Sequence, residues 1–397
     1  MTTMKDMMAA ADAPALFTLT TGPVNCYPEV LSALGKPVFY DYDPSFMAYY
    51  EKVMRKLSTA LGTSDIPIVL QGEPVLGLEA AAYSLVAPDD AVLNLASGVY
   101  GAGYGEWLKP RAGQFHEIRV VYNDVVDPVV VDEFLANHPE INLVAVCHHD
   151  TPSGTINPIK DIGEVVRKHG ALYVVDSVSA WAGVEVDVEA CHIDLLVTGP
   201  NKCLGCPPAL SILTVSERAW AKMEANPVAP RASILSILDW KDAWKASEGF
   251  PFTPSVSEIY GLEAGIDRYL EEGPENVWAR HAKTAKAMRA GVKAMGLELW
   301  VAREDIASPT CTTIKLPEGI DETVLRNLMK ARYGVVISSG RAETFNKLVR
   351  VGHMGPTAFP LYTVLALTAL GGAMGELLGK PLDIGAAVAA AEAVIRG

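Results

Sequence analysis

The sequence has little positive charge. Its 33 lysine and arginine residues are outnumbered by 47 aspartate and glutamate residues, which gives a formal net charge of −14 at pH 7. Such a chain has no surplus of basic side chains with which to release counterions from nucleic-acid phosphates. The same imbalance disfavours an anionic membrane surface. We therefore exclude nucleic acid and membrane lipid from the expected partners.

Long hydrophobic runs and dense cysteines are also missing. Residues 1–17 hold no apolar stretch of the length that a secretory signal needs. The apolar run from Thr363 to Met374, which two glycines interrupt, is shorter than the roughly 20 residues that span a bilayer. Six cysteines in 397 residues do not form a disulfide framework. These absences predict no membrane span and a reducing, cytoplasmic location.

No pattern in the sequence predicts a metal site. The segment Cys203-Leu-Gly-Cys206 is followed by two prolines and has no second ligand pair for zinc. The neighbouring His148-His149 would point to opposite sides of a strand and could not share one ion. His169 and His281, which fall in helical patterns, are expected on the surface.

Apolar runs of strand length alternate with helical patterns over the first half of the chain. Between several runs lie amphipathic segments such as Ile159 to His169. This alternation predicts an α/β fold with a mostly parallel sheet covered on both faces. The expected strands are Ile66–Leu70, Ala91–Leu95, His116–Tyr122, Leu143–Val146, Leu172–Val175, Leu195–Thr198 and Leu210–Thr214.

The alternation of strand and helix patterns ends after residues 252–255. A long helical pattern runs from Val256 through Ala294, and short strands and a tail helix from Ile384 to Ile395 follow it. The chain length allows two domains. We predict an N-terminal arm (residues 1–21) that packs with the small domain, a large domain (residues 22–264) and a smaller α/β C-terminal domain (residues 265–397).

Asp176 and Lys202 are the main candidates for catalysis. Asp176 follows the apolar run 172–175, and Lys202 lies in the loop after the next run. Ligands of parallel sheets bind at the carboxyl ends of the strands, so both side chains can meet on one small ring. A carboxylate can keep a pyridine nitrogen protonated while a lysine forms a Schiff base with the ring aldehyde. Taken singly, each residue is better explained as a strand-end acid or a solvated lysine; together they indicate vitamin B6 chemistry.

The glycine-rich segment 98–105 does not have the spacing of a dinucleotide-binding loop. We interpret it as a turn that presents Tyr100. An aromatic ring at this position can stack on a pyridine ring, although a packed tyrosine at a helix start would look the same in the sequence.

The chain resembles the fold type I, class V aminotransferases, a family that includes alanine–glyoxylate and serine–pyruvate aminotransferases. The motifs extend over nearly the whole length: Gly22-Pro23, Asp176-Ser-Val178, Asn201-Lys202, Thr253 in a segment that relatives lend to the neighbouring subunit, and Arg350-Val-Gly352-His-Met354-Gly355.

The resemblance implies a role for each of five residues. Lys202 would form the Schiff base, and Asp176 would pair with the pyridinium nitrogen. Tyr100 and Val178 would lie on the two faces of the ring. Arg350 would bind the substrate carboxylate through two parallel hydrogen bonds from its guanidinium.

The expected phosphate site departs from the family. Most members place small residues and a histidine at a helix N-terminus here, whereas this chain has Gly72-Glu73-Pro74-Val75. Pro74 has no N–H to donate. At an effective dielectric constant near 20, one negative charge about 4 Å from Glu73 costs about 4 kcal/mol, and pairing with Arg341 would reduce that repulsion. Phe250 stands where relatives bring a phosphate-binding tyrosine from the partner subunit.

Glu73 suits the 5′-hydroxymethyl group of an unphosphorylated B6 vitamer, whose O–H can donate to the carboxylate. A helix-start glutamate followed by proline is also a common pattern on its own. The resemblance implies an aminotransferase of vitamin B6 degradation that converts pyridoxamine and pyruvate to pyridoxal and L-alanine. Thr151 would contact a polar ring substituent, and Arg341 would belong to the substrate site. The protein would be a homotetramer. No cofactor would be tightly bound.

Two alternatives stay open at this point. The first is an alanine–glyoxylate or serine–pyruvate type aminotransferase that depends on pyridoxal 5′-phosphate (PLP) and has rebuilt its phosphate site; it would retain PLP through dialysis. The second is a non-catalytic B6-binding protein, which would bind pyridoxal at Lys202 without turning over any keto acid.

Overall fold

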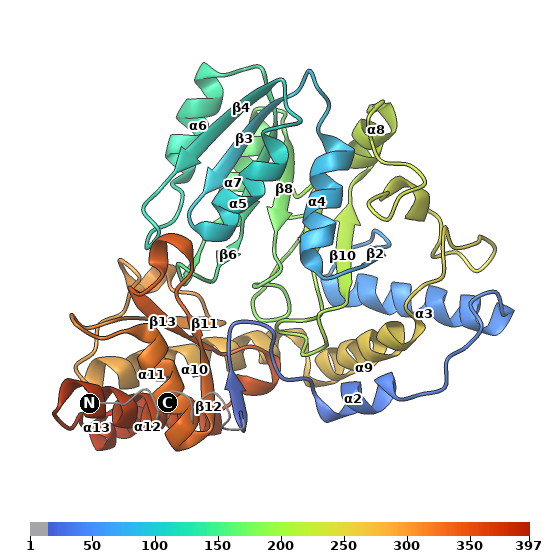
Figure 1. Cartoon of the computed structure of the whole chain (residues 1–397). Coiled ribbons are helices and arrows are strands. Elements are labelled where there is room, and N and C mark those ends of the chain that lie inside the picture. The colour runs from blue at the N-terminus through green and yellow to red at the C-terminus, as the bar shows by residue number, and fades with distance from the viewer. Residues whose placement is uncertain (1–14) are drawn as a thin grey trace.

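The computed structural model describes residues 15–397, which form two α/β domains, one around a seven-stranded sheet and one around a four-stranded sheet (Figure 1). A third, two-stranded sheet consists of residues His149–Asp150 and Thr155–Ile156. The larger sheet has seven strands, and only β10 runs antiparallel to its neighbours. The predicted α/β class with a mostly parallel sheet is confirmed. In spatial order the strands are β2 (Ile68–Gln71), β10 (Leu210–Val215), β9 (Leu195–Thr198), β8 (Leu172–Asp176), β5 (Ile141–Cys147), β3 (Ala91–Ala96) and β4 (Gln114–Arg119).

Helices cover both faces of this sheet because successive residues of its strands face opposite sides. Val174 packs in one hydrophobic core and Val175 in the other. The core with Val174 includes α4 (Pro74–Leu85), α5 (Val99–Leu108) and α8 (Glu217–Ala225). The core with Val175 includes α2 (Pro28–Leu34), α3 (Pro44–Leu61), α6 (Pro128–Asn137), α7 (Ile159–Lys168) and α9 (Val256–Glu272).

All seven predicted strands are present, but only β9 keeps its predicted bounds; the other six differ by one to three residues at one or both ends. β2 begins at Ile68, after Pro67, which has no backbone N–H to donate to a ladder. β4 ends at Arg119, where the prediction continued to Tyr122. The parallel ladder between β3 and β4 pairs Ala91 with Gln114 and Ala96 with Arg119, so the end of β3 also ends β4.

The small domain has a four-stranded sheet backed by helices. β1 runs parallel to β12 and so attaches the N-terminal segment to this domain; Figure 1 shows β1 (dark blue) beside β12. The strands, in spatial order, are β1 (Phe17–Leu19), β12 (Val335–Ser339), β13 (Leu348–Gly352) and β11 (Cys311–Lys315). Its helices are α10 (Pro274–Ala294), α11 (Glu322–Tyr333), α12 (Pro360–Leu378) and α13 (Ile384–Arg396), and its short 3-10 turns are η2 (Glu304–Ile306), η3 (Ala342–Thr344) and η4 (Gly355–Thr357). A further 3-10 turn, η1 (Leu238–Trp240), packs in the core of the large sheet.

The long helical pattern predicted from Val256 to Ala294 consists of two helices. Gly273 separates them with φ of +86°, a conformation that glycine adopts at low cost, and Pro274 begins α10. The predicted boundary between residues 264 and 265 lies inside α9, whose Ile266 packs in the large-domain core. Most of the predicted N-terminal arm, residues 1–14, lies outside the described residues.

Helix α12 corrects the prediction about its apolar run. It spans Pro360–Leu378, 19 residues, and within residues 15–397 it is the one helix long and apolar enough to cross a membrane by length and composition. Half of its apolar window is buried. Ala366 and Leu370 pack in the small-domain core, and α10, α11 and α13 surround the helix. The buried half of its apolar surface thus packs in the protein core.

His281 also differs from its prediction, because it is buried and not on the surface. Its Nδ1 lies 2.7 Å from the Val277 carbonyl, and its Nε2 accepts a hydrogen bond of 3.0 Å from the Gly355 amide. The ring therefore connects α10 to the loop after β13. His169 is partly buried, with Nε2 2.6 Å from Asp132 Oδ1.

Candidate active site

Asp176 ends β8 with its side chain buried. Its Oδ1 accepts a hydrogen bond of 3.0 Å from the amide of Val178, which fixes the carboxylate and the start of the following loop. Burial raises the pKa of Asp176 to about 6, while the Val178 amide and the charge of Lys202 oppose that rise. A desolvated carboxylate of this kind gains from a cationic partner, which fits a protonated pyridine nitrogen.

Lys202 follows β9 and is held by the N-terminal segment. Its Nζ donates a hydrogen bond of 2.6 Å to the carbonyl of Thr21. The amide of Thr21 donates in turn to Oγ of Ser338 on β12, at 2.9 Å. Burial lowers the pKa of Lys202 to about 8, and the nearby charge of Arg350 acts in the same direction. The amine can therefore exist in its neutral, reactive form near neutral pH.

Tyr100 lies at the first turn of α5, and a buried carboxylate fixes this turn. Asp150 Oδ2 accepts hydrogen bonds from the amides of Tyr100 at 2.7 Å and Gly101 at 3.0 Å. Gly98 permits this approach, because a Cβ there would lie 2.1 Å from the carboxyl carbon of Asp150. Burial raises the pKa of Asp150 to about 6. Asp150, in β6 (His149–Asp150), therefore positions the tyrosine.

Asp150, which follows His148-His149 directly, was not identified from the sequence. The sequence does hold a signal for this role. Asp150 follows β5, the strand beside β8, and therefore lies at the same sheet edge as the glycine-rich start of α5. The hairpin of β6 with β7 (Thr155–Ile156) holds it there.

Arg350 reaches across from β13 of the small domain. Its Nη1 donates to Oγ1 of Thr151 at 2.8 Å and its Nε to the carbonyl of Ser339 at 2.7 Å. In the described part of the chain its Nη2 makes no hydrogen bond. The side chain is buried, so a carboxylate that enters the site meets a fixed guanidinium with one free edge. Thr151 thus contacts Arg350; its contact with a polar ring substituent stays a prediction.

Glu73 is the N-cap residue of α4, with Pro74 at the first helical position. Its side chain makes no capping hydrogen bond and is exposed. Its negative charge adds to the rise that burial causes in the pKa of Asp176 and weakly opposes the fall that burial causes in the pKa of Lys202, so the carboxylate lies within electrostatic reach of both groups. A Cβ at Gly199 would lie 2.2 Å from Cγ of Pro74, so the loop before Lys202 packs directly on the start of α4.

Arg341 is exposed at the mouth of the site. Its guanidinium carbon lies 5.7 Å from the centre of the Tyr100 ring. Among residues 15–397, no ion pair joins Arg341 to Glu73, so the pairing that the sequence suggested is not formed.

The segment expected to supply a phosphate-binding group packs internally. The Phe250 ring is 5.0 Å from the ring of Tyr50, centre to centre, in an edge-on contact. The carbonyl of Thr253 accepts a hydrogen bond of 2.6 Å from Nε2 of Gln71, at the end of β2. The side chain of Phe250 has no hydroxyl to offer a ligand.

The adjacent His148 and His149 are buried and face different partners. Nδ1 of His148 lies 3.2 Å from Oγ of Ser177, and Nδ1 of His149 lies 3.1 Å from the carbonyl of Ser179. Burial lowers the pKa of His148 to about 3 and that of His149 to about 4, so both rings are neutral. They support the loop after β8.

The structure thus gathers the predicted site residues at the carboxyl ends of the large-sheet strands, next to β12 and β13. Backbone and side-chain hydrogen bonds join Asp176 to Val178 and Arg350 to Thr151. The catalytic and binding roles assigned to these residues remain predictions.

The chain matches a known protein family and is similar to known proteins over most of its length. Residues 105–362 match the class V aminotransferase family. A pyridoxamine–pyruvate transaminase of Mesorhizobium japonicum is 61% identical over 383 residues, which cover 96% of this chain and 97% of the relative. An (S)-ureidoglycine–glyoxylate transaminase of Bacillus subtilis is 31% identical over 364 residues, which cover 86% of each chain.

Solved structures show the same similarity over the whole fold. The crystal structure of pyridoxamine–pyruvate aminotransferase from Mesorhizobium loti superposes with a TM-score of 0.95, at 61% identity, and covers 97% of this chain and 98% of that one. The ureidoglycine–glyoxylate aminotransferase from Bacillus subtilis superposes with a TM-score of 0.90, at 29% identity, covering 96% and 98%.

Proposed function

This chain belongs to the class V aminotransferases, and from that premise we propose that it transfers the amino group of pyridoxamine to pyruvate, giving pyridoxal and L-alanine. The observation that carries the substrate assignment is Glu73 at the start of α4, next to a proline that has no N–H. This carboxylate repels a phosphate and can accept a hydrogen bond from a hydroxymethyl group. The similarity to a relative named for this reaction supports the same substrates.

The residues around the ring have separable tasks in this proposal. Asp176 binds the protonated ring nitrogen, and the protonated ring supplies the electron sink for the carbon that loses its proton. Tyr100 and Val178 hold the ring between them. Arg350 binds the carboxylate of pyruvate and thereby orients its keto carbon toward the amine of pyridoxamine.

Lys202 moves the proton in this proposal. Transamination requires a proton to leave the C4′ carbon of the vitamer and to reach the carbon that becomes Cα of alanine. An amine with a pKa of about 8 is a better matched base at neutral pH than one at the ordinary value of 10.5. Its hydrogen bond to Thr21 holds Nζ in place before substrate enters.

We further propose that the vitamer leaves as a product. Class V aminotransferases use PLP, and the phosphate ordinarily retains that cofactor through a helix N-terminus. Here Pro74 removes one donor and Glu73 adds a negative charge. Because pyridoxal has no phosphate, only Lys202 and the contacts with the ring retain it in the site, so it can dissociate.

We also propose that the protein works as a homo-oligomer, a tetramer, in the cytoplasm. An exposed apolar segment supports self-association: the exposed fractions are 69% for Val38, 48% for Phe39, 69% for Tyr40 and 61% for Tyr42. Such a patch is typical of a protein–protein contact. Analytical ultracentrifugation tests this point, and a monomer at micromolar concentration would contradict it.

The reaction itself is tested with purified protein, pyridoxamine and pyruvate. We expect pyridoxal and L-alanine in equal amounts, and no turnover by Lys202→Ala, which serves as the inactive control. Two results would overturn the proposal. Activity that needs added PLP and leaves pyridoxamine unconsumed would identify a PLP-dependent aminotransferase. Binding of pyridoxal without turnover of pyruvate would identify a binding protein.

A further inference from the structure

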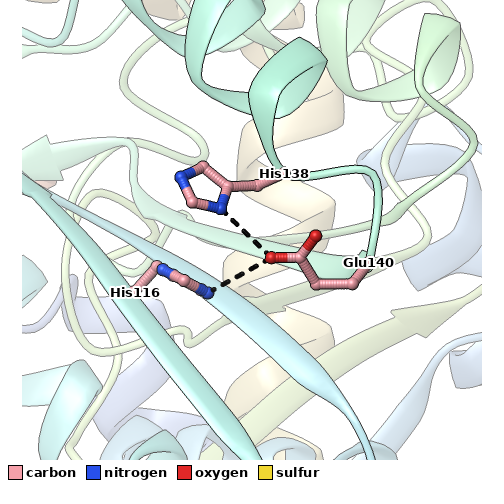
Figure 2. A group of neighbouring side chains, drawn as sticks. All are labelled: His116, His138 and Glu140. Carbon is pink, nitrogen blue, oxygen red and sulfur yellow. Dashed lines mark hydrogen bonds and ion pairs between the residues drawn. The ribbon is translucent and has the colours of Figure 1, made fainter.

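Three side chains converge beside β4, the edge strand of the large sheet. They are His116 on β4, His138 at the end of α6 and Glu140 just before β5. Figure 2 shows the Glu140 carboxylate between the two imidazole rings. Glu140 Oε1 lies 3.1 Å from Nδ1 of His138 and 3.8 Å from Nε2 of His116. No role in the proposed reaction uses these residues.

The two rings are held in position by a common aromatic neighbour. The His138 ring stacks on Phe134 with centres 4.4 Å apart, and the His116 ring meets Phe134 edge-on at 5.7 Å. Nε2 of His116 is buried and makes no hydrogen bond. A buried nitrogen without a partner is costly, and a bound cation would satisfy it.

We propose that His116, His138 and Glu140 bind a Zn²⁺ ion. Two imidazoles and one carboxylate, with a water as fourth ligand, are a donor set that zinc takes readily. The three ligand atoms lie within 4.8 Å of one another. Tetrahedral Zn²⁺ holds ligand atoms about 3.3 Å apart, from bonds of about 2.0–2.1 Å, so modest side-chain rotations close the site. All three side chains are partly exposed, with fractions of 23%, 34% and 38%, so an ion can enter from solvent.

The ion would stabilise this edge of the sheet. It joins an edge strand, which pairs only with β3 in the described sheet, to the end of α6 and the start of β5. An ion that binds the native state but not the unfolded chain raises the unfolding midpoint. The sequence gives no signal for this site, because the fold brings His116 to the other two ligands.

Zn²⁺ titration of the untagged, metal-free full chain tests the proposal, at a pH about one unit above the ordinary imidazole value of about 6.5. We expect one Zn²⁺ per chain by calorimetry and a higher thermal midpoint with Zn²⁺ present. His116→Asn and His138→Asn should each bind Zn²⁺ at least tenfold more weakly and lose the thermal shift. Glu140→Gln should also weaken binding while keeping the shape of the cluster.

Two histidines outside the cluster provide matched controls. His192 is exposed and has a φ of +54°, a conformation that asparagine tolerates. Among the described residues, His169 contacts the carboxylate of Asp132 and no second histidine. His192→Asn and His169→Gln should bind Zn²⁺ like the wild type. The proposal is overturned if the wild type binds no Zn²⁺, or if the cluster variants bind it as tightly as the two controls do.

Discussion

Nζ of Lys202 occupies the space that a side chain at position 22 would need: a Cβ on Gly22 would lie 2.0 Å from it. Gly22 also has φ of +124°, which few other residues adopt. The close approach lets Nζ reach the carbonyl of Thr21. The glycine of the Gly22-Pro23 motif therefore has a physical reason in the placement of the lysine.

Gly22→Ala should displace Lys202 from the Thr21 carbonyl. A misplacement of about 1 Å can cost about 100-fold in rate, so we expect kcat for pyridoxamine and pyruvate to fall by at least that order. Steady-state kinetics measures the loss, and circular dichroism checks that the fold is kept. A kcat within a few-fold of wild type would show that Lys202 does not need this approach.

Arg350→Lys should raise the KM for pyruvate and for L-alanine far more than the KM for either vitamer. Lysine keeps the charge but loses the planar pair of donors. The loss of a charged hydrogen bond, about 1.5–3 kcal/mol, corresponds to a rise of about 10- to 100-fold. If the KM for pyridoxamine rises more than that for pyruvate, the arginine does not bind the keto acid.

Asp150→Ala removes the acceptor that fixes the first turn of α5, a loss of about 0.5–2 kcal/mol in helix stability. Because Tyr100 must be ordered by this turn to hold the ring, the binding of pyridoxamine should weaken by up to the matching factor of about 2- to 30-fold. Both amide donors, of Tyr100 and Gly101, bond to the same oxygen, Oδ2. The amide oxygen of Asp150→Asn can replace it, so this variant should bind nearly like the wild type. Equal dissociation constants for the two variants would argue against a capping role.

The pH dependence of pyridoxal binding should report the pKa of Lys202. Only the neutral amine reacts with the aldehyde, so binding should strengthen as pH rises and level off above about 8, the lowered pKa of Lys202. Arg350→Gln removes a charge that lowers this pKa and should move the midpoint upward. A wild-type midpoint near 10 would contradict the effect of burial.

The sequence predicted the fold class because the strands of a parallel sheet are continuous apolar runs. It also indicated Asp176 and Lys202, since both follow such runs directly. It could not show that Arg350 contacts Thr151, because that hydrogen bond joins the two domains across a long stretch of chain. The partner of Lys202 is a backbone carbonyl, which carries no residue-type signal. His281 looked exposed because its burial depends on a loop that follows β13.

The substrate assignment depends most on Glu73. Glu73→Ser removes the charge that opposes a phosphate, and serine is a good N-cap residue that should preserve α4. Glu79→Gln, on the same helix, removes one charge elsewhere and serves as the control.

The most direct measurement is the ratio of the dissociation constants of PLP and pyridoxal for the wild type and these two variants. We predict that the wild type binds pyridoxal more tightly than PLP. Glu73→Ser should shift the ratio toward PLP by about tenfold or more, because it removes a repulsion of up to about 4 kcal/mol. Glu79→Gln should leave the ratio unchanged. A wild type that already prefers PLP, or a ratio that Glu73→Ser does not change, would contradict the account.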